Sequence, residues 1–216
     1  MNEINEKPHY GKINPFTGIW VRTRETVRYV IEEKSFGYVM MLIVIAGIIS
    51  SLVGAFDPEA TAGFPIWGTL LMGIIIGPIA GIVGVAIISA IYLVIGKLFK
   101  GTSTYSEMFK AIGTTSIPSI WFAPILLVGY LAAPDLMAVD AEVEITPASM
   151  IIGGLMAIAG LVFTIWSILI QSKAIGEAHR FSSWKGFFTL LIPGVIGLVL
   201  LIALIIFLVA TFMNFS

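Results

Sequence analysis

Cysteine is absent from this chain of 216 residues, and charged residues are scarce. Without cysteine the protein has no disulfide framework and no thiol chemistry. Charged residues make up 12% of the sequence and hydrophobic residues 58%, whereas soluble domains carry about 25% charged residues. The composition therefore argues against an ordinary soluble domain and indicates a membrane protein.

Charge is also missing from five long apolar runs, which cover residues 38–55, 67–96, 117–133, 149–170 and 187–212. A helix that crosses a bilayer needs about 17–25 apolar residues, so each run is long enough to span. The run 67–96 exceeds this length. It is either one tilted helix bent at Pro78 or two shorter pieces.

Basic residues are missing from one side of a five-span arrangement. That side holds six acids instead: Asp57, Glu59, Asp135, Asp140, Glu142 and Glu144. All twelve Lys and Arg fall on the other side: Lys7, Lys12, Arg22, Arg24, Arg28, Lys34, Lys97, Lys100, Lys110, Lys173, Arg180 and Lys185. The positive-inside rule places the basic side and the N-terminus in the cytosol and the C-terminus outside. Splitting the run 67–96 into two crossings would destroy this pattern.

The sequence therefore predicts an all-α, polytopic membrane protein, a bundle of five transmembrane helices with short cytosolic interfacial helices. Residues 1–36 form the cytosolic N-terminal segment and residues 37–216 the five-span membrane domain.

Two cytosolic segments have helical patterns. From Trp20, apolar residues share one face and Arg24 and Arg28 another, with Thr23 as N-cap, while the chain before Trp20 should be loose, with a turn at Asn14-Pro15. This helix either lies in the membrane interface or packs on the ends of the bundle. In the second segment, Thr104 and Glu107 have capping-box spacing, and Gly113 stands where the helix would end.

An aromatic-lysine pair occurs twice at the same distance before an Ile-Pro step. "FKAIGTTSIPSI" and "WKGFFTLLIPGV" share four of twelve residues, consistent either with an internal repeat about an axis normal to the membrane or with chance. Aromatic residues and lysines suit the headgroup level. We predict a membrane-interface or partner-binding role, with topology determinants as the alternative, for Trp20, Arg24, Arg28, Phe109, Lys110, Trp184 and Lys185.

Small residues recur at four-residue spacing in the second run, at Gly73, Gly77 and Gly81. Such a strip lets two helix backbones approach closely. We predict a helix-packing role for these glycines, either inside the bundle, which is the favoured interpretation, or between two copies of the chain.

Catalytic and metal-binding patterns are missing as well. No charged residue or histidine lies inside a predicted span, and His9 and His179 are the two histidines of the chain. Glu177 and His179 are too few ligands for a metal and are expected to be solvated loop residues. Thr164, Ser167 and Gln171 should bond between helices or, alternatively, line a substrate path. We expect no enzyme activity, no metal, no cofactor and no nucleic-acid partner.

The chain resembles the Yip domain family, known in eukaryotes as Ypt/Rab GTPase-interacting proteins. The likeness rests on "INPFTGIWVRTRETVRYVIEEKS", "KGTSTYSEMFKAIGTTSIPSI" and "AIGEAHRFSSWKGFFTLLIP" and extends from about residue 14 to 212. The resemblance implies a group whose eukaryotic members act in vesicle traffic and bind small GTPases and one another. The short N-terminal region here argues against GTPase binding and suggests a prokaryotic member in the cell membrane.

Two functional hypotheses follow from these patterns. In the first, the protein is a non-catalytic membrane scaffold that binds the bilayer, other membrane proteins or further copies of itself. In the second, it is a small permease or a transporter subunit. The absence of charge within the spans favours the first.

Overall fold

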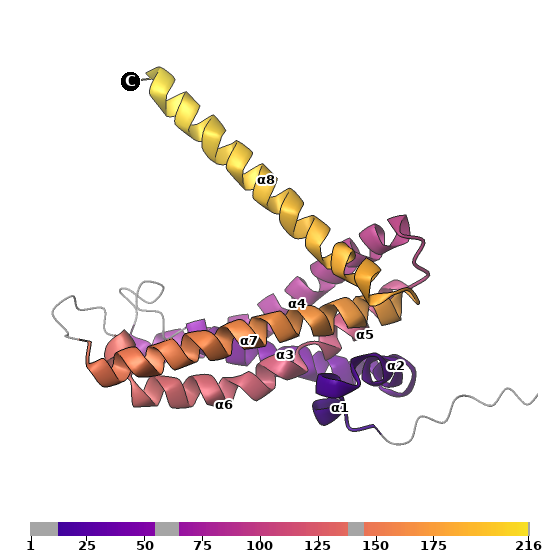
Figure 1. The fold of residues 1–216 in the computed structure, drawn as a ribbon, viewed down its shortest axis with the longest axis horizontal. Helices are drawn as coiled ribbons and strands as arrows, with labels where there is room; N and C mark the ends of the chain where they lie inside the picture. Colours follow the sequence, from indigo (N-terminus) through magenta and orange to yellow (C-terminus); the bar gives the residue numbers. More distant parts are fainter. Residues whose placement is uncertain (1–12, 55–64, 138–144, 216) are drawn as a thin grey trace, which may run out of the picture.

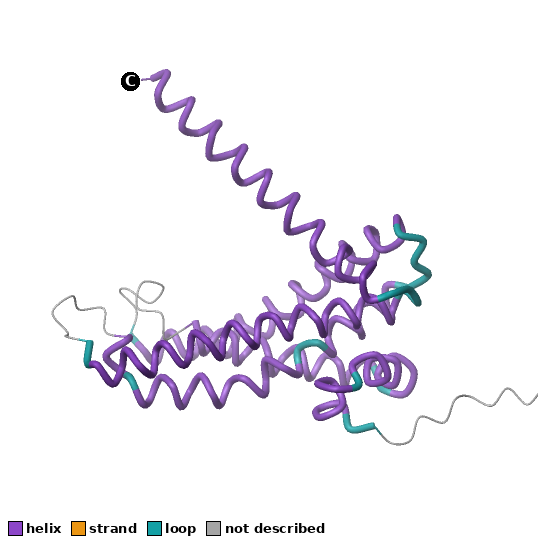
Figure 2. The backbone as a smooth tube through the Cα atoms, viewed as in Figure 1, coloured by secondary structure: helices purple, strands orange, loops and turns teal. Residues whose placement is uncertain are grey.

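The chain folds into helices joined by loops, as the computed structural model shows (Figures 1 and 2). The structure describes residues 13–54, 65–137 and 145–215, and within these ranges there is no strand. Residues named in the sequence analysis that lie outside the described ranges are Lys7, His9, Lys12, Asp57, Glu59, Asp140, Glu142 and Glu144. The helices are α1 (Pro15–Val21), α2 (Thr23–Glu33), α3 (Phe36–Gly54), α4 (Ile66–Leu98), α5 (Tyr105–Thr114), α6 (Ile117–Ala132), the short 3-10 helix η1 (Pro134–Met137), α7 (Pro147–Ala178) and α8 (Ser183–Phe215).

Each of the five predicted apolar runs forms one helix: α3, α4, α6, α7 and α8. The long second run is a single helix that contains Pro78, so the prediction of one helix rather than two is confirmed. Four segments are long and apolar enough to cross a membrane: Leu70–Leu98, Tyr105–Gly129, Pro147–Ala178 and Ser183–Leu208. The second of these reaches that length only by joining α5 to α6, which are separate helices. The apolar segment Phe36–Leu52 of α3 is shorter.

The N-terminal segment differs from the prediction because a helix begins where a turn was expected. Asn14 caps α1, with its side chain accepting a hydrogen bond from the Phe16 N–H over 3.0 Å, and Pro15 follows in the first turn. Asn before Pro is a turn signal, but it is also a helix start. Trp20 thus lies on α1, separated from Arg24 and Arg28 on α2.

Thr23 does not serve as the N-cap of α2 by its side chain. Its hydroxyl donates to the carbonyl oxygen of Ile19 over 2.9 Å, which satisfies an acceptor at the end of α1. The expected capping box of α5 is confirmed. Thr104 Oγ1 accepts from the Glu107 N–H, and a Glu107 carboxylate oxygen accepts from the Thr104 N–H.

The two aromatic-lysine segments have different local structures. The first is interrupted between α5 and α6, whereas the second lies within the unbroken helix α8. Both follow a helix that ends with a residue of positive φ, Lys100 after α4 and Arg180 after α7. In each case an N–H beyond the end bonds back to a glycine carbonyl, from Gly101 to Gly96 and from Phe181 to Gly176, both over 2.9 Å.

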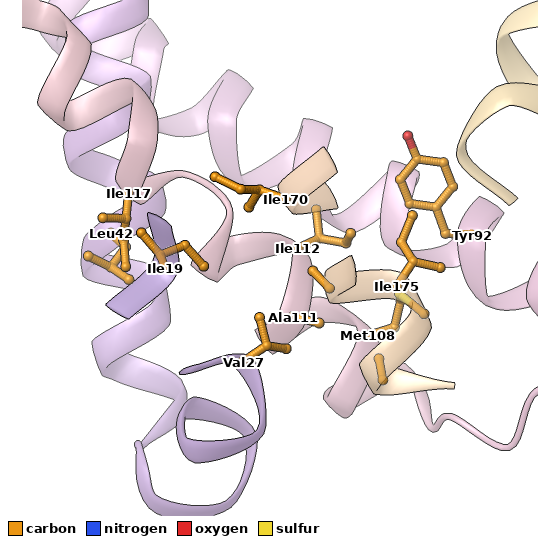
Figure 3. Close-up of a cluster of buried hydrophobic side chains, with 12 residues drawn as sticks. Ile19, Val27, Leu42, Tyr92, Met108, Ala111, Ile112, Ile117, Ile170 and Ile175 are labelled. Carbon is orange, nitrogen blue, oxygen red and sulfur yellow. The ribbon is translucent and has the colours of Figure 1, made fainter. Parts of the chain in front are cut away.

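The largest group of buried side chains lies where α1, α2 and α5 meet the ends of the long helices (Figure 3). It joins Ile19 and Val27 from the N-terminal helices to Met108 of α5 and Ile175 of α7. The described part of the N-terminal segment therefore shares one core with the rest of the chain. Burying such side chains contributes about 1.5–3 kcal/mol each.

Helix α8 leaves the other helices after its first turns and runs away from them (Figure 1). From Val195 to Leu208 every large apolar side chain in this helix is exposed. The long helices are thus not one compact bundle of five, because no helix of the described ranges packs along the outer part of α8.

Candidate functional site

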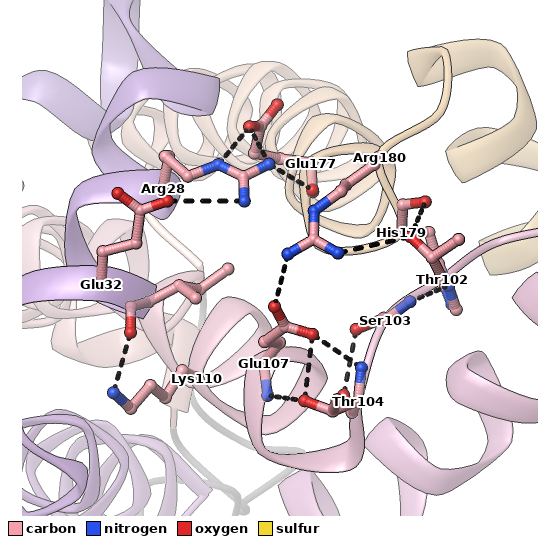
Figure 4. A network of polar contacts seen from close by, with 11 residues as sticks. Arg28, Glu32, Thr102, Ser103, Thr104, Glu107, Lys110, Glu177, His179 and Arg180 are labelled. Atoms are coloured by element: carbon pink, nitrogen blue, oxygen red, sulfur yellow. Dashed lines mark hydrogen bonds and ion pairs between the residues drawn. The ribbon is translucent and has the colours of Figure 1, made fainter. Parts of the chain in front are cut away.

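Charged and polar side chains from α2, α5 and α7 meet at the end of the molecule that holds the buried core (Figure 4). We call this group the polar junction. Its members are Arg24, Arg28, Glu107, Lys110, Glu177, His179 and Arg180.

Glu177, in the last turn of α7, binds two arginines of α2. Arg28 Nε donates to Glu177 Oε1 over 2.8 Å, and Arg28 Nη2 donates to the Glu177 carbonyl oxygen over 3.2 Å. Arg24 Nε lies 3.5 Å from Glu177 Oε2. The side chains of Arg28 and Glu177 are only 15% and 16% exposed. Water therefore screens the Arg28–Glu177 pair less than it screens an exposed ion pair. An exposed pair contributes at most about 1 kcal/mol to stability.

Arg180 links the end of α7 to α5. Its Nη2 lies 2.9 Å from Glu107 Oε1, and Glu107 is the acid of the α5 capping box. Arg180 has a φ of 57°, a left-handed conformation that costs a non-glycine residue about 1 kcal/mol. One glutamate therefore both caps α5 and holds α5 to α7.

Lys110 links α5 back to α2. Its Nζ donates to the carbonyl oxygens of Ile31 and Lys34, over 2.9 and 2.7 Å. Carbonyls at the end of a helix lack partners within the helix and favour a cation. The contacts from α2 to α7, from α7 to α5 and from α5 to α2 thus form a closed ring of charged links.

His179 lies in a narrow slot between two glycines. Its Nε2 lies 3.1 Å from the Tyr92 carbonyl oxygen, and its Nδ1 accepts from the Ser103 N–H over 3.4 Å. This pairing requires the neutral ring with its proton on Nε2. A Cβ atom at Gly96 or at Gly101 would overlap the imidazole ring. Burial lowers the pKa of His179, which favours the same neutral form.

The prediction that Glu177 and His179 are solvated loop residues is wrong. Helix α7 continues to Ala178, well past residue 170, and His179 is 1% exposed. The apolar spacing of Ile170, Ala174 and Ala178 carries the helical face beyond the predicted span and was the signal for this extension.

The polar junction holds helices together through groups that are paired with one another or with the backbone. Both ring nitrogens of His179 have backbone partners, and the Glu177 carboxylate is shared by two arginines. Among the described residues there is no group of three or more His, Cys, Asp or Glu that could hold a metal ion.

The predicted glycine strip faces α3 of the same chain. A Cβ atom at Gly77 would lie 2.5 Å from the Gly47 carbonyl oxygen, and one at Gly81 would lie 3.3 Å from the Ile43 carbonyl oxygen. At Gly73 the nearest atom is the Ser51 Cβ, at 3.3 Å. The strip is therefore covered within one chain, and two copies could meet through it only if α3 moved away.

The structure separates the predicted interface residues into two groups. Phe109 is buried and its ring stacks on that of Phe36 at 4.8 Å. Trp20 is half-buried beside the core. Trp184 is 73% exposed, and Lys185 beside it is exposed as well. Arg24, Arg28 and Lys110 belong to the polar junction, so the structure gives them internal partners.

Two apolar clefts lie along α6. One, of about 360 Å³, is lined by Phe16, Thr17, Trp20, Trp121, Phe122 and Ile125. The other, of about 480 Å³, lies between α6 and α7 and shares Ile125. Neither is lined by Thr164, Ser167 or Gln171.

Helices of this length with apolar side chains exposed along them define an all-helical integral membrane protein. The model of one family, the Yip1 domain, matches residues 17–205. This match covers most of the chain, so the protein belongs to the Yip1 domain family, as the sequence resemblance indicated. Comparisons with curated proteins and with solved structures found no match.

Proposed function

We propose that this protein is a non-catalytic membrane scaffold that binds other membrane proteins. The observation that carries the proposal is the closed ring of charged links among α2, α5 and α7. A ring of this kind holds the short helices in one arrangement relative to the long ones. A surface of constant shape suits partner binding, because little ordering entropy is then lost on association.

The proposed topology has five spans, formed by α3, α4, α6, α7 and α8. The N-terminus is in the cytosol and the C-terminus outside, in the cell membrane of a prokaryote. The distribution of Lys and Arg supports this orientation. The division into residues 1–36 and 37–216 then describes the position relative to the membrane, since both parts contribute to one core.

A permease is not favoured. The Thr164 hydroxyl donates to the Gly160 carbonyl oxygen of its own helix over 2.8 Å. The clefts along α6 are lined almost wholly by apolar side chains. A polar solute would lose its hydration there without gaining hydrogen bonds, at a cost of several kcal/mol.

The test is recovery of partners after mild crosslinking in native membranes, with the tagged full-length protein. The variant Glu177→Gln weakens the ring, and Glu33→Gln on the exposed face of α2 is the matched control. We expect specific membrane proteins to be recovered with the parent and with Glu33→Gln, and to be lost with Glu177→Gln at unchanged helix content. Arg180→Gln, at a half-exposed side chain, provides a milder break if Glu177→Gln does not insert.

Equal recovery from all variants would remove the role of the ring. Recovery no greater than with an unrelated tagged membrane protein, together with solute flux in proteoliposomes, would favour the permease.

A further inference from the structure

The basic residues of the described chain divide into an inward and an outward set. Arg24, Arg28, Lys110 and Arg180 belong to the polar junction, and Lys34 lies 5.3 and 5.4 Å from the ring centroids of Tyr29 and Tyr38. These five residues form the inward set. The other basic residues of the described ranges have no ion pair there and form the outward set: Arg22, Lys97, Lys100, Lys173 and Lys185.

Three cations of the outward set gather where α4 ends and α8 begins, and Figure 1 shows these two helix ends beside each other. Lys97 and Lys100 flank Phe99, and the Lys185 Nζ lies 3.5 Å from the Phe99 carbonyl oxygen. All three side chains are exposed. We call this group the α4–α8 basic patch.

Within the described ranges no carboxylate forms an ion pair with any of the three lysines of this patch. Glu107 is occupied by Arg180, and Glu177 by Arg24 and Arg28. The carbonyl end of α4 favours cations, but a helix end carries only about half a charge against three lysines. The patch therefore fits an anion.

Large apolar side chains project beside the same lysines. Leu98 is 78% exposed and Trp184 is 73% exposed. Both stand at the ends of segments that are long and apolar enough to cross a membrane, Leu70–Leu98 and Ser183–Leu208. Tryptophan and lysine at the end of a span belong at the level of the lipid headgroups. An apolar surface beside three cations matches the acyl chains and the phosphate of one lipid.

We propose that Lys97, Lys100 and Lys185, with Trp184 and Leu98, form a binding site for the headgroup of an anionic phospholipid. The lysine ammonium groups donate hydrogen bonds to phosphate oxygens, and Trp184 and Leu98 contact the adjoining glycerol and acyl region. The sequence alone identified only Trp184 and Lys185. Lys97 and Lys100 join them because α4 ends against the start of α8.

The experiment titrates the detergent-solubilised full-length protein with phosphatidylglycerol or phosphatidylcholine and counts bound lipids by native mass spectrometry. Lys97→Gln/Lys100→Gln removes two charges from the patch. Arg22→Gln/Lys173→Gln removes two charges outside it and is the matched control. Glutamine at residue 100 keeps a non-glycine residue at its positive φ of 64°, so both doubles should unfold like the parent.

We expect the parent to prefer phosphatidylglycerol. In Lys97→Gln/Lys100→Gln the affinity for the first bound phosphatidylglycerol should fall about 25-fold, which is roughly fivefold for each lysine. The control double should change it far less, and phosphatidylcholine binding should change in neither. Raising the salt to 1 M, where the Debye length is about 3 Å, should reduce the preference of the parent.

Three results would overturn the proposal. In the first, the control double would weaken phosphatidylglycerol binding as much as the patch double does. In the second, the parent would bind phosphatidylglycerol and phosphatidylcholine equally. In the third, a glutamate-rich decapeptide or inorganic phosphate would displace the lipid at comparable concentration, which would assign the patch to a soluble anion. Lys185→Gln offers an independent single variant, in which the affinity for phosphatidylglycerol should fall about fivefold.

Discussion

Replacing Gly96 by alanine should destabilise the protein through His179. The new methyl group would overlap the imidazole ring, which is 1% exposed and hydrogen-bonded through both nitrogens. The ring also stacks on Phe181 at 5.1 Å, and Gly101 closes the other side of the slot. The imidazole therefore cannot rotate away while it keeps its partners.

Gly84 in the same helix provides the control, because apart from its own helical turn no atom of the described residues lies within 4 Å of a Cβ there. Alanine in place of glycine favours a helix by about 0.5–1 kcal/mol, and this gain is common to both variants. Overlap in a packed site costs about 1–3 kcal/mol. Expelling the ring instead loses two hydrogen bonds of about 1 kcal/mol each and its packing. The variant adopts whichever of these two responses costs less free energy. Gly96→Ala should therefore be about 1–3 kcal/mol less stable than Gly84→Ala.

The assay is reversible unfolding in detergent micelles, followed by circular dichroism. A double-mutant cycle adds His179→Ala, which removes the ring that the methyl group meets. In that background Gly96→Ala should behave like Gly84→Ala, giving a coupling energy of the same 1–3 kcal/mol or so. Equal stability of Gly96→Ala and Gly84→Ala in the parent would refute the slot.

Further perturbations test the helix packing, the pH dependence and the topology. Gly77→Leu should force α3 and α4 apart and cost more than about 3 kcal/mol, whereas Gly84→Leu should be tolerated, as thermal unfolding would show. Because burial lowers the pKa of His179 below its usual 6.5, the unfolded chain binds a proton first as the pH falls. The contribution of His179 to the free energy of unfolding is therefore complete above about pH 6.5 and is lost as the pH falls toward the lowered pKa. The melting temperature of the parent should drop between pH 7.5 and pH 5.5, and that of His179→Gln should drop less. In the proposed topology Ala148 lies outside the cell and Ser106 in the cytosol, and both side chains are exposed. An impermeant thiol reagent applied to intact cells should therefore label Ala148→Cys and spare Ser106→Cys. The reverse labelling pattern would show that the topology is inverted.

The sequence by itself determined the helical class and the position of the long helices. Apolar runs without charge predict spans because the bilayer interior offers no partner to a charge or an open backbone. The capping box at Thr104 and the single helix through Pro78 were likewise readable. The capping box acts between residues three positions apart, so one short window of the sequence contains both partners. The single helix through Pro78 followed instead from the positions of Lys and Arg along the whole chain.

Tertiary structure alone decided which polar residues are internal. Arg28 and Glu177 are 149 residues apart in the chain, and Ser103 and His179 are 76 apart. Nothing in either local window distinguishes a solvated glutamate from one bound by arginines of another helix. The same holds for Lys97 and Lys100, which have an ordinary helix end as their local setting. Lys185 reaches the Phe99 carbonyl between them only because α8 begins beside the end of α4, and that juxtaposition is a property of the folded chain.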